Sequence, residues 1–128
     1  MDINKLKTIV IEAAREELLP RFTRVKRGIK ADGSFLTEAD LAVQNRIADE
    51  LKTHWPDILF LGEEMAAEEQ QTLLQSGKPI WILDPLDGTG NYASGIPVYS
   101  VSLALIEQGE LRMGIVYDPE RDECFSCL

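Results

Sequence analysis

Hydrophobic positions at helical spacing mark two stretches in the first half of the chain. Across residues 2–19 the apolar side chains recur every three or four positions with charged residues between them, and Pro20 follows. Thr37 is a residue type that often caps a helix, and residues 38–54 show the same spacing until Trp-Pro-Asp at 55–57 interrupts it. This period predicts two amphipathic helices, each with one face buried in a core.

The remaining apolar residues come in short runs that are typical of buried strands. The expected strands are 58–61, 79–83, 98–106, 111–117 and 123–128. Gly109 lies in a short polar connection, so the third and fourth of these strands are predicted to form a hairpin. Two helices followed mainly by strands predict an α+β fold, with two long helices packed on a mainly antiparallel sheet.

Three connecting segments are less regular. The basic residues of segment 21–30 predict a solvated helix end, where cations also suit the helix dipole, and residues 31–34 have the composition of a loop. The polar segment 63–79 predicts a short helix or a loop. Asp84-Pro85 is expected to stop the strand before it, because proline fixes φ and cannot donate a hydrogen bond to a neighbouring strand.

Length and charge narrow the classes of protein that fit. At 128 residues the chain is predicted to form one domain, residues 1–128, and its 45% apolar content is that of a globular protein. A net charge of −9 disfavours binding to nucleic-acid polymers or to anionic membrane surfaces. The N-terminal residues do not have the pattern of a signal peptide, and two cysteines cannot form a disulfide framework. We therefore expect a cytoplasmic protein.

Acidic residues follow two of the predicted strands. Asp84 ends the apolar run before it and Asp87 comes three residues later, so a turn can direct both carboxylates to one point. Asp-Pro and Asp-Gly are also common in ordinary turns, which is the plainer interpretation. Glu63 follows the strand at 58–61 in the same way, and if the two strands are neighbours the three carboxylates converge. Such a group is costly unless a cation lies among them, and Mg²⁺ prefers oxygen ligands of this kind.

Segment 81–94 resembles the signature of the inositol monophosphatase family, whose members are Mg²⁺-dependent, lithium-sensitive phosphatases. Gly62-Glu63-Glu64 is similar to the Gly-Glu-Glu element of that family, and Thr37-Glu38-Ala39-Asp40 is similar to its Thr-x-x-Asp element. The three elements occur in the family's order and span nearly the whole chain. The resemblance implies hydrolysis of a small phosphorylated substrate, such as inositol monophosphate, by activated water and without a phosphoenzyme.

The resemblance also implies roles for individual residues. The metal ligands would be Glu63, Asp84, Asp87 and the backbone carbonyl of Leu86. Asp40 and Thr89 would orient or deprotonate the attacking water, with Glu63 as the third residue of the catalytic set. Asp40 also has a plainer interpretation, since it can complete a capping box with Thr37, and Thr89 can simply stabilise its turn.

Substrate contacts are implied for residues of the same segment. Asp87, Gly88 and Thr89 would bind the substrate, the last two through backbone amides, where small residues let an anion approach closely. Lys30 resembles a family lysine in a loop that closes over the site. Family members are about twice as long as this chain, which therefore resembles their N-terminal half.

The short length has consequences for activity. A further metal-binding aspartate of the family lies in a Trp-Asp element, and neither Trp55 nor Trp81 is followed by Asp. We therefore expect the 128-residue chain alone to be nearly inactive and to self-associate, with a homodimer as the expected state. The alternative is a non-catalytic metal-binding or dimerising module derived from this phosphatase family.

Overall fold

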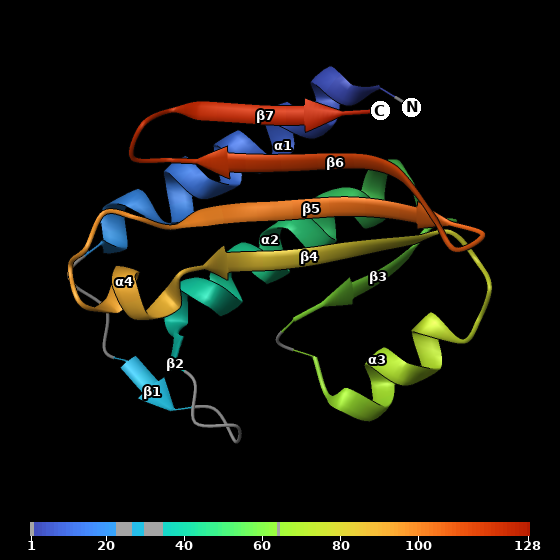
Figure 1. Ribbon diagram of the computed structural model, residues 1–128, viewed down its shortest axis with the longest axis horizontal. Coiled ribbons are helices and arrows are strands. Elements are labelled where there is room, and N and C mark those ends of the chain that lie inside the picture. The colour runs from blue at the N-terminus through green and yellow to red at the C-terminus, as the bar shows by residue number, and fades with distance from the viewer. Residues whose placement is uncertain (1, 23–26, 30–34, 64) are drawn as a thin grey trace.

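The computed structural model is built from two layers, a pair of helices and a five-stranded sheet (Figure 1). It describes residues 2–22, 27–29, 35–63 and 65–128. The helices α1 (Ile3–Glu17) and α2 (Glu38–His54) lie behind the sheet in Figure 1. A short 3₁₀ turn, η1 (Leu19–Arg21), contains Pro20 and follows α1. The α+β architecture predicted from the sequence is confirmed.

Side-chain caps stabilise the start of both long helices. The side chain of Asp2 accepts hydrogen bonds from the amides of Asn4 and Lys5 at the start of α1. Thr37 caps α2, and its partner Asp40 completes a capping box by accepting from the Thr37 amide at 2.9 Å. Each cap satisfies amide donors that have no partner inside the helix. The predicted start of the second helix is therefore confirmed.

The sheet has the order β3-β4-β5-β6-β7 and mixes both strand directions. Its strands are β3 (Leu59–Gly62), β4 (Ile80–Asp87), β5 (Ser100–Glu107), β6 (Glu110–Asp118) and β7 (Glu123–Cys127). Only β3 and β4 run parallel, and the other pairs are antiparallel. Helix α3 (Ala67–Leu74) lies in the connection from β3 to β4, which makes the parallel pairing possible.

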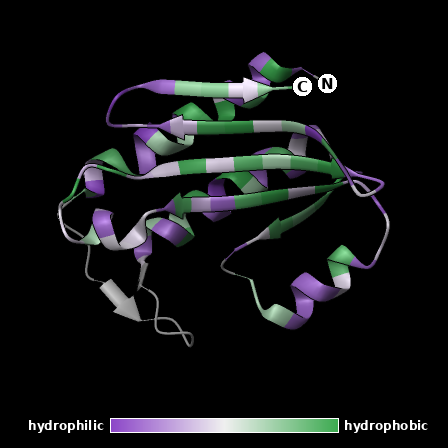
Figure 2. Ribbon diagram, in the orientation of Figure 1, coloured by the Kyte–Doolittle hydropathy of each residue, from purple (hydrophilic) through white to green (hydrophobic). Residues whose placement is uncertain are grey.

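The core lies between the helices and one face of the sheet. Alternate side chains of β5 and β6 point into it, as the period of a half-buried strand requires. Figure 2 shows the hydrophobic positions along these strands and along the two helices. The fully buried side chains include Leu6, Val10, Val43, Ile47, Trp81, Leu103, Ile115 and Tyr117. No helix within the described residues is long and apolar enough to cross a membrane.

Two local predictions are wrong. Segment 21–30 is not simply a helix end, because β1 (Arg27–Ile29) lies in it and pairs with β2 (Phe35–Thr37) in a separate two-stranded sheet. Pro85 does not stop β4, which continues to Asp87 through an irregularity of register between Asp84 and Asp87. A bulge of this kind accommodates a residue that cannot donate to the neighbouring strand. A one-turn helix, α4 (Thr89–Ala93), follows β4.

Candidate active site

The carboxyl ends of β3 and β4 bring two acidic segments together at one edge of the sheet. Gly62 is paired with Leu83 in the parallel register, so Glu63 and Asp84 are the next residues along their strands. The amide of Glu63 donates to the carbonyl of Leu83 at 3.0 Å and continues this pairing by one step. The strands that lead into Glu63 and Asp84 are therefore neighbours, as the predicted convergence of the acidic residues requires.

Asp84 is the most strongly perturbed carboxyl group at this edge. Burial raises its pKa, and a hydrogen bond and charge repulsion from Glu63 add to the effect, as does the charge of Asp87, so that the pKa of Asp84 is about 8. Desolvation and like charges both disfavour the ionised form of a carboxyl group. The ionised form of Asp84 is therefore disfavoured at this edge, in a place where a cation would stabilise it.

The three acidic residues that were expected to converge lie at the same edge of the sheet. Within the described residues, no three His, Cys, Asp or Glu side chains form a group that could hold a metal ion as they lie. Glu63, Asp84 and Asp87 thus share one edge of the sheet, and their role as a ligand set remains a proposal.

The irregularity in β4 arranges the next residues around a compact turn. The amide of Leu86 donates to Asp84 Oδ1 at 3.3 Å, while the side chain of Leu86 is buried in the core. The Leu86 carbonyl accepts from Thr89 Oγ1 at 2.9 Å. The turn therefore fixes the backbone between the two aspartates and ties it to the first residue of α4.

Asp40 joins this turn to the start of α2. It is completely buried, and its Oδ2 accepts from the amide and the hydroxyl of Thr37 at 2.9 and 2.6 Å. Its Oδ1 lies 3.0 Å from Thr89 Oγ1, a contact between residues 49 positions apart in the chain. Asp40 therefore completes the cap of α2 and is also in contact with Thr89. This contact lies beside the acidic edge, by which we mean the sheet edge that carries Glu63, Asp84 and Asp87.

Gly88 allows the backbone to turn from β4 into α4. Its φ of 91° and ψ of 35° lie in the left-handed region, which residues with a side chain rarely adopt. A Cβ atom at this position would lie 2.9 Å from the carbonyl oxygen of Val98. Any side chain here would push apart the turn and the segment before β5.

Gly88→Ala is therefore expected to lower the free energy of unfolding by about 2 kcal/mol or more, since backbone strain and a steric clash act together. Gly77→Ala is the matched control, because Gly77 also has a positive φ, 72°, but a Cβ atom added there would meet no other atom within 4 Å. The control should lose only about 1 kcal/mol. Urea unfolding of both variants measures the difference, and equal losses would show that the Val98 contact is unimportant.

A hollow on the outer face of the sheet begins at this turn. It is lined by Asp87, Gly88, Tyr99, Asp118 and Phe125, among others. The Asp118 carboxylate is already engaged, since it accepts from the amides of Glu120 and Arg121 and pairs with the Arg121 guanidinium. Asp87 is thus the exposed acid at the boundary between the hollow and the acidic edge.

Lys30 and Gln70 differ in how they relate to the site. Lys30, the expected loop contact, lies outside the described residues. Gln70 of α3 was not singled out from the sequence, yet its side-chain amide contacts the backbone of the loop that carries Glu63. Around Gln70 the sequence shows only a glutamine one turn inside a polar helix. Such residues are too common to predict this contact.

The sequence profile of the inositol monophosphatase family matches residues 2–128. The chain belongs to this family. A fructose-1,6-bisphosphatase/inositol-1-monophosphatase of Thermotoga maritima is 39% identical over 98 residues, which cover 77% of this chain and 34% of that protein. The Nus factor SuhB of Pasteurella multocida is 32% identical, in a match that covers 98% of this chain and 48% of that protein. Phosphatases and a protein named as a Nus factor are thus both relatives of this family member.

Solved structures of the family show the same fold. The Thermotoga maritima IMPase superposes with a TM-score of 0.85 at 31% identity, covering 99% of this chain and 48% of that one. An IMPase/NADP phosphatase solved with Mg²⁺ and phosphate has a TM-score of 0.82 at 23% identity, and the match covers 98% of this chain and 47% of that one. This similarity concerns the fold alone. This family member spans about half the length of most of these relatives, and 34% of the first.

Proposed function

We propose that this chain carries the metal-binding and water-positioning part of a Mg²⁺-dependent phosphatase that hydrolyses small phosphomonoesters such as inositol monophosphate. The contact between Thr89 Oγ1 and Asp40 Oδ1 at 3.0 Å is the observation that carries the proposal. It places a buried carboxylate and a hydroxyl beside the turn that bears Asp84 and Asp87. Membership of a phosphatase family supports the same reaction class.

The residues at the acidic edge fit a divalent cation by their chemistry. Glu63, Asp84, Asp87 and the carbonyl of Leu86 are hard oxygen donors, which Mg²⁺ prefers. Burial first, and then the neighbouring Glu63 and Asp87, raise the pKa of Asp84, and a cation at this edge would offset the repulsion between these groups. A bound divalent cation would supply charge neutralisation and would lower the pKa of water bound to it.

Asp40 and Thr89 are suited to positioning that water. Thr89 has one hydroxyl proton for two acceptors, Asp40 Oδ1 and the Leu86 carbonyl. When the proton is donated to Asp40, the lone pairs of the hydroxyl remain free to accept a hydrogen bond from water. Asp40 cannot turn away, because Thr37 holds its other oxygen through two hydrogen bonds. The pair thus orients water toward a phosphate held near Asp87 and the amides of Gly88 and Thr89.

Phosphate release from a panel of substrates tests the function. The panel holds inositol monophosphate, histidinol phosphate, a bisphosphate nucleotide and a sugar bisphosphate, each with Mg²⁺, with EDTA, and with Mg²⁺ plus Li⁺. We expect slow hydrolysis that requires Mg²⁺ and is inhibited by Li⁺, measured at high protein concentration. Calorimetric titration of the chain with Mg²⁺ alone is the companion measurement. A folded chain that binds no Mg²⁺, or hydrolysis that persists in EDTA, would contradict the proposal.

A pair of threonine variants separates this activity from that of a contaminating phosphatase. Thr89→Val keeps the shape of the side chain and removes the hydroxyl, so hydrolysis should fall by about a hundredfold or more. Thr72→Val makes the same change on the exposed surface of α3 and should leave hydrolysis unchanged. Equal activity in the two variants would remove Thr89 from the reaction.

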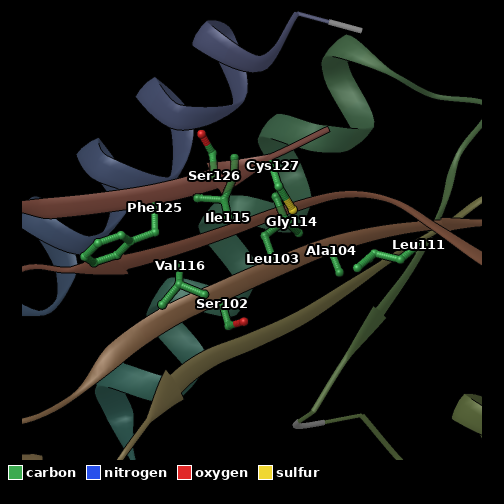
Figure 3. Close-up of a pocket in the computed structure, with 10 residues that line it drawn as sticks. All are labelled: Ser102, Leu103, Ala104, Leu111, Gly114, Ile115, Val116, Phe125, Ser126 and Cys127. Carbon is green, nitrogen blue, oxygen red and sulfur yellow. The ribbon is translucent and has the colours of Figure 1, made fainter.

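A second candidate function, a dimerising module without catalysis, is favoured by the outer face of the sheet. Figure 3 shows Val116 and Phe125 side by side on neighbouring strands of this face, with Leu111 farther along β6. These three side chains are 41%, 60% and 62% exposed, and they border an apolar hollow that no described helix covers. Burying such a patch is favourable, so we infer that a second copy of the chain would cover it.

Sedimentation equilibrium in EDTA distinguishes the two candidates when it is combined with the Mg²⁺ titration. A dimer that forms without metal and binds no Mg²⁺ would favour the module. A monomer or dimer that binds Mg²⁺ and releases phosphate would favour the phosphatase. Phe125→Lys should weaken a dimer formed through this face, and a dimer of unchanged strength would place the interface elsewhere.

A further inference from the structure

The loop that carries Glu63 is held from outside by one side chain of α3. Gln70 Nε2 lies 3.1 Å from the carbonyl oxygen of Gly62, 3.1 Å from that of Glu63 and 3.0 Å from that of Met65. A side-chain amide has two protons, so its donors are shared among these three acceptors. All of them belong to the turn that begins at the end of β3.

Backbone and sulfur contacts also hold the described residues of this turn. The Met65 amide donates to the Gly62 carbonyl at 3.1 Å, and the Gly62 amide lies 3.0 Å from Met65 Sδ. The Glu63 amide is tied to β4 through the Leu83 carbonyl. Gln70 therefore completes the set, because it holds the Glu63 carbonyl while β4 holds the Glu63 amide. With both sides of the residue fixed, only side-chain rotations remain to direct its carboxylate.

We propose that Gln70 is a positioning residue that holds Glu63 at the acidic edge for metal binding. The inference rests on the proposed function, since Glu63 is a ligand only if the edge binds a cation. Gln70 is half-buried on the inner side of α3, whereas Gln71 beside it is exposed. Residues that orient a metal ligand without touching the metal commonly change its affinity by 10–100-fold when they are replaced.

The variant Gln70→Met tests this role, because methionine keeps the length of the side chain and removes both donors. Gln71→Met is the matched control, with the same substitution one residue along the same helix. Titration with Mg²⁺ alone, on protein shown by circular dichroism to be folded, should give an affinity about tenfold or more weaker for Gln70→Met. The control should stay within twofold of the natural chain.

Hydrogen exchange of the metal-free proteins provides a second readout. The Met65 amide should exchange about tenfold or more faster in Gln70→Met than in Gln71→Met, since the turn that it closes has lost its outer support. Unchanged exchange together with unchanged Mg²⁺ affinity would overturn the positioning role. A loss of folding stability alone, with Mg²⁺ affinity intact in the folded protein, would also overturn it.

The two proposals fail in different ways. If the natural chain binds no Mg²⁺, the proposed phosphatase site is wrong and the metal-positioning role of Gln70 is wrong with it. If the natural chain and Gln70→Met bind Mg²⁺ equally well, the site stands and only the role of Gln70 is overturned.

Discussion

In metal-free solution, Asp84→Asn is expected to be more stable than the natural chain by about 2 kcal/mol at pH 8.5. Burial and the neighbouring carboxylates raise the pKa of Asp84 to about 8, so its ionised form is unfavourable in the folded chain. Asparagine removes the charge and keeps the oxygen that accepts from the Leu86 amide. Since Asp84 is only partly buried, water screens part of the repulsion, and we expect less than the full effect of the shift.

The sign of the pH dependence follows from the direction of the shift. Above a pH of about 4 the unfolded chain releases the proton of Asp84, while the folded chain keeps it until about pH 8. The natural chain therefore loses stability relative to Asp84→Asn as the pH rises through this window, and the difference is constant above it. Urea unfolding in EDTA at pH 5, 7 and 9 measures the difference.

Mg²⁺ should reverse the order of stability. A ligand that binds only the folded state stabilises it, so Mg²⁺ is expected to raise the Tm of the natural chain and not that of Asp84→Asn. Asp57→Asn is the control, because Asp57 is exposed just before the opposite end of β3 and the variant makes the same change in charge. An Asp84→Asn variant that responds to Mg²⁺ as the natural chain does would remove Asp84 from the ligand set.

Asp40→Ala is expected to lower the free energy of unfolding by about 3 kcal/mol, or about 10 °C in Tm. The completely buried carboxylate accepts from the Thr37 amide, the Thr37 hydroxyl and the Thr89 hydroxyl. Alanine leaves the Thr37 amide and hydroxyl without this acceptor and removes half of the capping box of α2. The Thr89 hydroxyl loses its contact with Asp40 and can then donate only to the Leu86 carbonyl. Thermal and urea unfolding measure the loss.

The matched control for this prediction is Asp49→Ala on the same helix. Asp49 is exposed, and among the described residues it is the backbone carbonyl of Asp49 that accepts a hydrogen bond from a side chain, that of Thr53. Its replacement should change the free energy of unfolding by less than about 0.5 kcal/mol. Similar losses in the two variants would mean that the contacts of Asp40 contribute little to stability.

Local patterns predicted the parts of this fold that depend on neighbouring residues. The capping box at Thr37 and Asp40 formed as its spacing indicates. The hairpin between β5 and β6 turns at Gln108 and Gly109, both with positive φ, which is the geometry expected for a two-residue connection. In each case three or four consecutive residues contain the whole signal.

Contacts between segments far apart in the sequence could not be predicted in the same way. No local pattern shows that Thr89 meets Asp40, or that Gln70 reaches the carbonyls after β3. The continuation of β4 past Pro85 also depends on its partner, since the shifted pairing with β5 accommodates the missing amide. The sequence therefore predicted the types of residue at the site, while their orientation depends on tertiary packing.

The single parallel pair in the sheet also bears on how the chain folds. Strands β5, β6 and β7 join neighbours in sequence, whereas β3 reaches β4 only across α3, and Asp40 reaches Thr89 across 49 positions. Closing longer loops costs more chain entropy, so the antiparallel meander should form early and the acidic edge late. A full-length chain that refolds from denaturant would then possess most of its sheet before it possesses its site, and ligand binding would report that folding is complete.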